Sequence, residues 1–166
     1  FGTPAPVSLT HCAATASSSR VRVRGSGVTV PKNSDLRSVP RGNARASLGK
    51  CQEFANTAQS ALADEKWTAA GLNAIHAGIA AADAALIASA GLRSTSQDHG
   101  SVVSVLEQQV PEFDATQRRQ LSGLLKMKNQ VAYEQRLLTY IESRQLVDHA
   151  TRLTRWAEGV VKDHLA

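Results

Sequence analysis

The segment AAGLNAIHAGIAAADAALIASA, residues 69–90, decides the fold class of this 166-residue chain. Alanine, its commonest residue, has the highest helix propensity, and the segment approaches the length of a membrane-spanning helix. Asn73, His76 and Asp83 would each be costly to place in lipid, so a membrane span is not expected. We therefore predict a central, buried helix of a soluble protein, whose alanines and two glycines let neighbouring helices approach closely.

Helical periodicity continues on both sides of this segment. Apolar residues recur at spacings of three and four over residues 44–64, 99–110 and 115–135, and again after residue 139. No stretch alternates apolar and polar residues as a half-buried strand would. The pattern predicts an all-α fold, an up-and-down bundle of about five helices over residues 43–164. The expected caps are Gly91, Ser96 or Asp98, Asp114, and Thr139 with Glu142 in a capping box.

Residues 1–40 have a different composition. They are rich in Ser, Thr, Pro, Gly and Arg, so they cannot bury enough apolar surface to offset the loss of chain entropy. Residues 1–50 carry eight basic groups and one acid, whereas residues 51–166 carry 11 basic groups and 13 acids. We predict a disordered basic tail that is either simply solvated or adds nonspecific affinity for phosphate. Since the chain begins with Phe, a natural start near Val30 is one interpretation.

The cysteines and histidines argue against a disulfide framework and a metal site. Cys12 and Cys51 are too few for such a framework and lack the spacing of metal ligands. Cys51 falls on the apolar stripe of the first helix, where a small buried residue is expected. No two histidines stand four residues apart, so we expect neither a metal nor a cofactor. These features favour a reducing, cytoplasmic environment.

Three stretches of the predicted bundle resemble a known family. They are HAGIAAADA (residues 76–84), GLRSTSQDH (91–99) and KMKNQVAYE (126–134). In this order, over residues 44–164, the chain looks like a HEPN domain. The resemblance implies a bundle of four or five helices that is often a homodimer. Active members of the family are metal-independent ribonucleases, many of them toxins in toxin–antitoxin pairs, commonly beside a minimal nucleotidyltransferase.

The catalytic signature of that family is an Arg, a polar residue that is often Asn, three to five further residues and a His, on the fourth helix. In this chain Lys128 stands at the Arg position, Asn129 at the polar position and Tyr133 at the His position. Lysine lacks the planar fork that binds a phosphate through two nitrogens. Tyrosine, with a reference pKa of about 10, is a poor base near neutral pH. The resemblance thus implies a degenerate motif. In one alternative, Lys128 is solvated and Tyr133 packs at an interface. In another, Tyr133 accepts a nucleotidyl group from a partner enzyme.

Arg93 and His99 offer a second Arg-then-His spacing, in the loop RSTSQDH. We expect a polar network that closes this loop, with Asp98 capping the third helix and Arg93 or His99 paired with Asp83. His76 lies two helical turns before Asp83, on the same face. A buried carboxylate needs a partner, which favours the network. The alternative is that His76, Asp83, Arg93 and His99 line a pocket for a ligand or RNA.

The sequence favours a HEPN-like helical module, degenerate at the usual motif, that dimerises and binds RNA, a nucleotide or a protein partner. A toxin–antitoxin or stress-response setting fits the resemblance, with a nucleotidyltransferase-type antitoxin as the protein partner. One alternative is an active metal-independent ribonuclease with a non-standard site, built from Arg93 and His99 or from Lys128 and Tyr133. Another is a purely structural protein whose alanine-rich helix is an oligomer interface.

Overall fold

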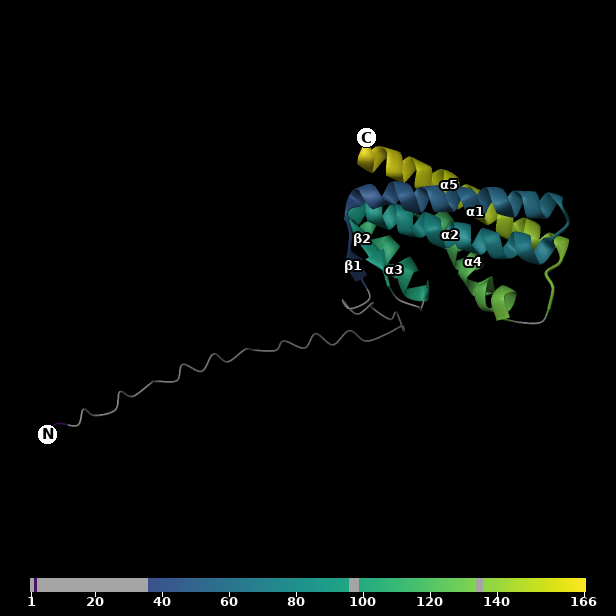
Figure 1. Cartoon of the computed structure of the whole chain (residues 1–166), viewed down its shortest axis with the longest axis horizontal. Helices are drawn as coiled ribbons and strands as arrows, with labels where there is room; N and C mark the ends of the chain where they lie inside the picture. The colour runs from purple at the N-terminus through teal and green to yellow at the C-terminus, as the bar shows by residue number, and fades with distance from the viewer. Residues whose placement is uncertain (1, 3–35, 96–98, 134–135) are drawn as a thin grey trace.

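The structure, a computed structural model, describes Gly2 and residues 36–95, 99–133 and 136–166. Five α-helices form the predicted all-α bundle, and a short two-stranded ribbon lies at one of its ends (Figure 1). In chain order the elements are β1 (Leu36–Ser38), the 3-10 helix η2 (Arg41–Asn43), α1 (Ala44–Ala63), α2 (Trp67–Ala90), β2 (Leu92–Ser94), α3 (His99–Gln109), α4 (Ala115–Tyr133) and α5 (Tyr140–Leu165).

The central helix of the bundle is α2. All four other helices pack against it, α1 and α5 most extensively. More than half of its residues are buried, and most of these are alanines; one face, which includes His76, is exposed or partly exposed. Its length and composition would suffice to cross a membrane, but 72% of its most apolar window is buried inside the bundle. It is therefore the buried core helix that its sequence predicts.

Two glycines of α2 contact leucine side chains from other parts of the chain. A Cβ at Gly78 would overlap Leu124 of α4, and a Cβ at Gly71 would overlap Leu138, just before α5. Leu124 is fully buried and Leu138 nearly so. Because protein interiors are close-packed, a side chain at either glycine would push its neighbour away. The two glycines thus set how closely α4 and the start of α5 approach α2.

Cys51 lies in α1 and is fully buried, which confirms the sequence prediction. Its Sγ lies 3.2 Å from the Thr154 hydroxyl of α5. Burial raises the pKa of the Cys51 thiol to about 11. The thiol therefore stays protonated near neutral pH, and it acts as a small packing residue between two helices.

The start of α5 is fixed by a network around Glu142. Thr139 and Glu142 form the predicted capping box. Two guanidinium nitrogens of Arg136 donate hydrogen bonds to the Glu142 carboxylate, at 2.8 and 3.2 Å. The hydrogen bonds from Arg136 and Thr139 lower the pKa of Glu142 to about 2. The carboxylate is therefore ionised at physiological pH and ties the preceding segment to the helix.

The ribbon corrects the sequence prediction at both of its strands. Residues 36–40 fall within the predicted disordered tail of residues 1–40, and β2 falls within the predicted loop. Instead β1 and β2 pair antiparallel, with Leu36 opposite Ser94. Strands of three residues are too short to show an alternating pattern, so sequence periodicity could not reveal them. The rest of the tail prediction, apart from Gly2, concerns residues outside the described part of the chain.

Gly91 turns the chain at the end of α2 so that β2 can pair with β1. It adopts φ 66°, the left-handed conformation of the predicted C-cap of α2. Its carbonyl accepts a hydrogen bond from the Val39 backbone nitrogen at 2.8 Å. The chain therefore turns back along the last turns of α2 and brings β2 beside that helix.

We predict that Gly78→Ala destabilises the bundle whereas Gly159→Ala stabilises it. The new methyl at position 78 must displace fully buried Leu124, and overpacking of this kind costs about 1–3 kcal/mol. Gly159 is exposed on α5, and nothing lies within 4 Å of an added Cβ, so alanine there only improves helix propensity, by about 0.5–1 kcal/mol. Urea unfolding followed by circular dichroism measures both changes. Equal stability of the two variants would contradict the close packing at Gly78.

Candidate functional site

The three residues of the degenerate motif lie in the last turns of α4. Lys128 and Tyr133 are five positions apart, which is about 140° around the helix, so α4 alone does not present them as a pair. Lys128 is partly buried, and the side chains of Asn129 and Tyr133 lie outside the described part of the chain. A reacting site here would need a group from another helix or from a second protomer.

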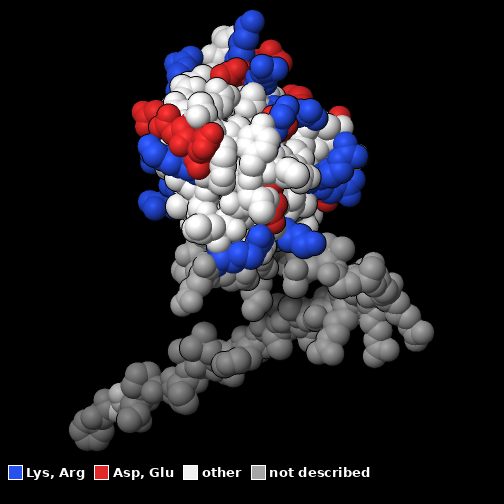
Figure 2. Space-filling view, turned by 90° about the vertical axis from the view of Figure 1, so that its right-hand side faces the viewer, with Lys and Arg blue, Asp and Glu red and all other residues white. Residues whose placement is uncertain are grey.

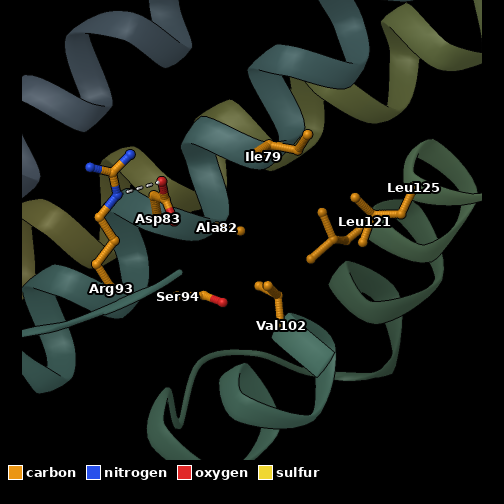
Figure 3. A pocket seen from close by; sticks show the side chains of 8 residues that line it. All are labelled: Ile79, Ala82, Asp83, Arg93, Ser94, Val102, Leu121 and Leu125. Atoms are coloured by element: carbon orange, nitrogen blue, oxygen red, sulfur yellow. Dashed lines mark ion pairs between the residues drawn. The ribbon is translucent and has the colours of Figure 1, made fainter. Parts of the chain in front are cut away.

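The structure brings Asp83 of α2 together with Arg93 of β2 (Figure 3). The Arg93 Nε lies 3.4 Å from an Asp83 carboxylate oxygen; the Asp83 side chain is 18% exposed and that of Arg93 is 55% exposed. Burial raises the pKa of Asp83, and the positive charges of Arg93 and Lys50 oppose this effect only in part. The turn at Gly91 creates the pair, because it returns β2 along α2.

The other residues of the predicted polar network lie elsewhere or are not described. His76 is exposed, two turns before Asp83, and stacks on Phe54 of α1 with ring centroids 5.3 Å apart. Asp98 falls outside the described residues. His99 begins α3, and its side chain is also outside the described part. Among the residues that the structure describes, the network therefore consists of Asp83 and Arg93.

A groove between α4 and α5 contains a histidine that the sequence pattern did not mark as functional. The groove encloses about 290 Å³. Both helices contribute polar or charged residues to it, and apolar side chains form the remainder. Its lining comprises Gly123, Lys126 and Met127 from α4, and Glu142, Gln145, Leu146 and His149 from α5.

The His149 ring packs directly against the backbone of α4. Its Nδ1 is buried and has no hydrogen-bond partner among the described residues. A Cβ at Gly123 would stand 3.2 Å from this atom, a tight contact that the ring would have to relieve by a small shift. Nε2 is then the ring nitrogen that can meet a ligand in the groove.

The protonation of His149 follows from its surroundings. Burial lowers its pKa, the charges of Arg152 and Arg119 lower it further, and Asp148 opposes them. A histidine whose pKa lies below its ordinary value of about 6.5 is mostly neutral at pH 7. The imidazole is therefore mostly neutral, and its Nε2 accepts a proton in the tautomer that carries the ring hydrogen on Nδ1.

His149 also ends a stretch with the spacing of the signature described above for HEPN domains. Arg144 is followed by polar Gln145, three further residues and His149, in the stretch RQLVDH. This stretch lies on α5, whereas the resemblance places the signature on the fourth helix. The signal is present in the sequence, but it is missed when the motif is located by helix number.

Arg144 does not meet His149 within this chain. The two are about 140° apart around α5. Arg144 is exposed, and its Nη1 donates a hydrogen bond to the Tyr140 hydroxyl at 3.1 Å. Its guanidinium carbon lies 6.0 Å from the centre of the Tyr140 ring. The guanidinium is therefore held at the surface, beside the start of α5.

No protein-family model and no curated protein matches this chain. The HEPN resemblance consequently rests on the three quoted stretches and on the order of the helices. Its two candidate signatures, at Lys128–Tyr133 and at Arg144–His149, differ in one chemical respect. Only the second contains a histidine.

We predict that Asp83→Asn raises the stability of the bundle at neutral pH. The folded pKa of Asp83 lies above its unfolded value, so ionisation costs stability as the pH rises through the folded pKa. The neutral amide avoids that cost and keeps an oxygen that can accept from Arg93. In urea unfolding, the advantage of the variant should be present at pH 7 and shrink as the pH falls toward 3.8.

The matched control is Asp64→Asn. Asp64 is an exposed carboxylate at the α1–α2 turn, paired with Lys66 at 3.0 Å. Its replacement should give no gain at pH 7, because exposed pairs contribute little. A loss of stability in Asp83→Asn at pH 7 would mean that the Arg93 pair outweighs the cost of burial.

Proposed function

We propose that this chain is a HEPN-like helical module that binds RNA in the groove between α4 and α5 and cleaves it without a metal ion. The observation that carries the proposal is a neutral imidazole, His149, in a groove of about 290 Å³, five residues after Arg144. A neutral histidine can take a proton from a ribose 2′-hydroxyl. Neither the lysine nor the tyrosine of the degenerate motif is suited to that task near neutral pH.

Positive charge around the groove supports binding of a phosphate backbone. Lys126 lines the groove, and Arg119 and Arg152 lie close enough for their charges to lower the pKa of His149. These cations come from both helices. Glu142, the acidic residue of the lining, is already bound within the capping network of α5. Three cations, Lys126, Arg119 and Arg152, thus surround His149 against the carboxylates of Asp148 and Glu142, and such cations attract the phosphates of RNA nonspecifically.

The proposed step is an internal transfer at phosphorus. As His149 takes the proton of the 2′-hydroxyl, that oxygen attacks the adjacent phosphorus and the bond from phosphorus to the 5′-oxygen breaks. The departing oxygen takes a proton from solvent, which leaves a 2′,3′-cyclic phosphate and a 5′-hydroxyl. Negative charge on the phosphate in the transition state is best stabilised by a guanidinium, which can donate two parallel hydrogen bonds. Arg144 of the partner subunit would supply it in a dimer.

An exposed uncharged patch supports the dimer. Leu137 and Ile141 are 77% and 76% exposed, beside the partly exposed Tyr140. Figure 2 looks onto this end of the bundle and shows a broad uncharged face with charged groups around it. Exposed apolar side chains of this kind are typical of interaction surfaces. In the proposal this patch is the homodimer interface, and Arg144 lies at its edge.

The biological setting is proposed from the resemblance. A metal-independent ribonuclease of this kind would act as a toxin or stress-response factor in the cytoplasm. Its protein partner would be a nucleotidyltransferase-type antitoxin, with Tyr133 as a candidate acceptor of a nucleotidyl group.

RNA binding without cleavage is the second candidate. The observation that favours it is the contact of Arg144 with Tyr140, which holds the guanidinium away from His149 within one protomer. The groove would then bind phosphates through its cations, and His149 would serve only to pack α5 against Gly123.

We predict that the full chain cleaves single-stranded RNA in the presence of a metal chelator. His149→Gln should lower the rate by about 10²–10⁴-fold, the usual contribution of a general base, while RNA is still bound. Lys128→Ala/Tyr133→Ala should cleave at the wild-type rate. Gel electrophoresis follows cleavage, and fluorescence anisotropy at two salt concentrations follows binding.

Each other outcome of this assay has a definite meaning. Loss of cleavage only in the Lys128/Tyr133 variant would place the reacting site on α4. RNA that stays intact but binds with a salt-dependent affinity would support the second candidate. A folded protein that neither cleaves nor binds RNA would contradict both candidates and favour a purely structural protein.

A composite site predicts complementation between inactive variants. Arg144→Ala and His149→Gln should each be inactive alone, and mixing them should restore about a quarter of wild-type cleavage. The reason is that half of the randomly mixed symmetric dimers contain both chains, and each of these has one complete site. Light scattering checks that the mixture is dimeric. A dimer without recovered cleavage would contradict a site shared between protomers.

A further inference from the structure

A second cavity lies between α2, β2, α3 and α4, away from the groove that contains His149 (Figure 3). It encloses about 150 Å³. An apolar protein cavity of about this volume takes up benzene, so a ligand of roughly six to eight non-hydrogen atoms fits. Its apolar side consists of Ile79, Ala82, Val102, Leu121 and Leu125, and its polar side of Asp83, Arg93 and Ser94.

Asp83 stands where the two sides meet. In the view of Figure 3 it lies between Arg93 and the apolar side chains. The ion-pair contact with Arg93 is 3.4 Å long, through Nε, longer than the roughly 2.7–2.9 Å of a strong charge-assisted hydrogen bond. More than half of the Arg93 side chain faces solvent. The carboxylate is therefore mostly buried but only weakly neutralised.

The second cation that acts on Asp83 lies on the other side of it. Lys50 of α1 lines a separate cavity of about 200 Å³, which Asp83 and Arg93 also border. Lys50 does not line the cavity between α3 and α4. A cationic group in that cavity would consequently share the Asp83 carboxylate with Arg93, which also lines the cavity, and would not displace Lys50 from it.

We propose that the cavity between α2, β2, α3 and α4 binds a small primary amine with a compact hydrocarbon group. The ammonium pairs with Asp83, and the hydrocarbon contacts Val102, Leu121 and Leu125. An anion attracted by the half-exposed Arg93 would also meet the more deeply buried Asp83 carboxylate, and a neutral hydrocarbon would leave that carboxylate without a new donor. A cation with an apolar body satisfies both sides of the cavity, since a buried charge needs a partner and apolar walls favour apolar contact.

The experiment measures binding of benzylamine to the full chain by isothermal titration calorimetry, with backbone amide NMR shifts to locate the site. Benzyl alcohol has the same shape without the charge, and methylamine has the charge without the hydrocarbon. We expect benzylamine to bind at least about tenfold more tightly than either, because only it uses both sides of the cavity. Asp83→Asn should weaken benzylamine binding by about tenfold or more, and Asp64→Asn should leave it unchanged.

A second variant tests the volume independently of charge. Val102→Phe places a ring in the cavity and should abolish benzylamine binding without removing any charged group. Benzyl alcohol binding as tightly as benzylamine, or full affinity in Asp83→Asn, would overturn the proposal. Absence of binding by the folded wild type would overturn it as well. RNA cleavage and RNA binding are measured in separate assays, so the test of this cavity is independent of the test of the α4/α5 groove.

Discussion

The rest of the structure depends on the close approach of the other helices to α2. A helix that other helices approach closely presents small residues at the contacts, because large side chains there would hold its neighbours apart. Alanines meet that requirement along its whole length, and Gly71 and Gly78 meet it where Leu138 and Leu124 enter. The bundle therefore combines close approach of helix backbones at these small residues with buried Leu and Ile side chains between them.

A small residue also allows close packing where α4 meets α5. Gly123 has no side chain to separate the helices, so the His149 ring lies against the α4 backbone with Nδ1 buried. That packing removes water from one edge of the imidazole and lowers its pKa, together with the charge of Arg152. Tight packing thus has an electrostatic consequence. It keeps neutral the only histidine described in the groove.

The helix α4 separates the two cavities on which the proposals rest. Leu121 and Leu125 face the cavity that holds Asp83, whereas Gly123 and Lys126 line the groove that holds His149. Residues two positions apart on a helix point in different directions, so one helix can serve both. The two sites are distinct in chemistry as well. One offers a weakly neutralised carboxylate beside apolar walls, and the other offers a neutral imidazole among cations.

The sequence by itself determined the class of fold, because helical periodicity and capping residues are local properties. The helix ends near Ala63 and Ala90 and the capping box at Thr139 follow from neighbouring residues alone. Only the tertiary structure decided the pairing of β1 with β2 and the contact of the His149 ring with Gly123. It also decided that the Asp83 carboxylate borders the cavity between α2, β2, α3 and α4. These features join segments that are far apart in the chain, and their burial and charge depend on how closely the helices pack.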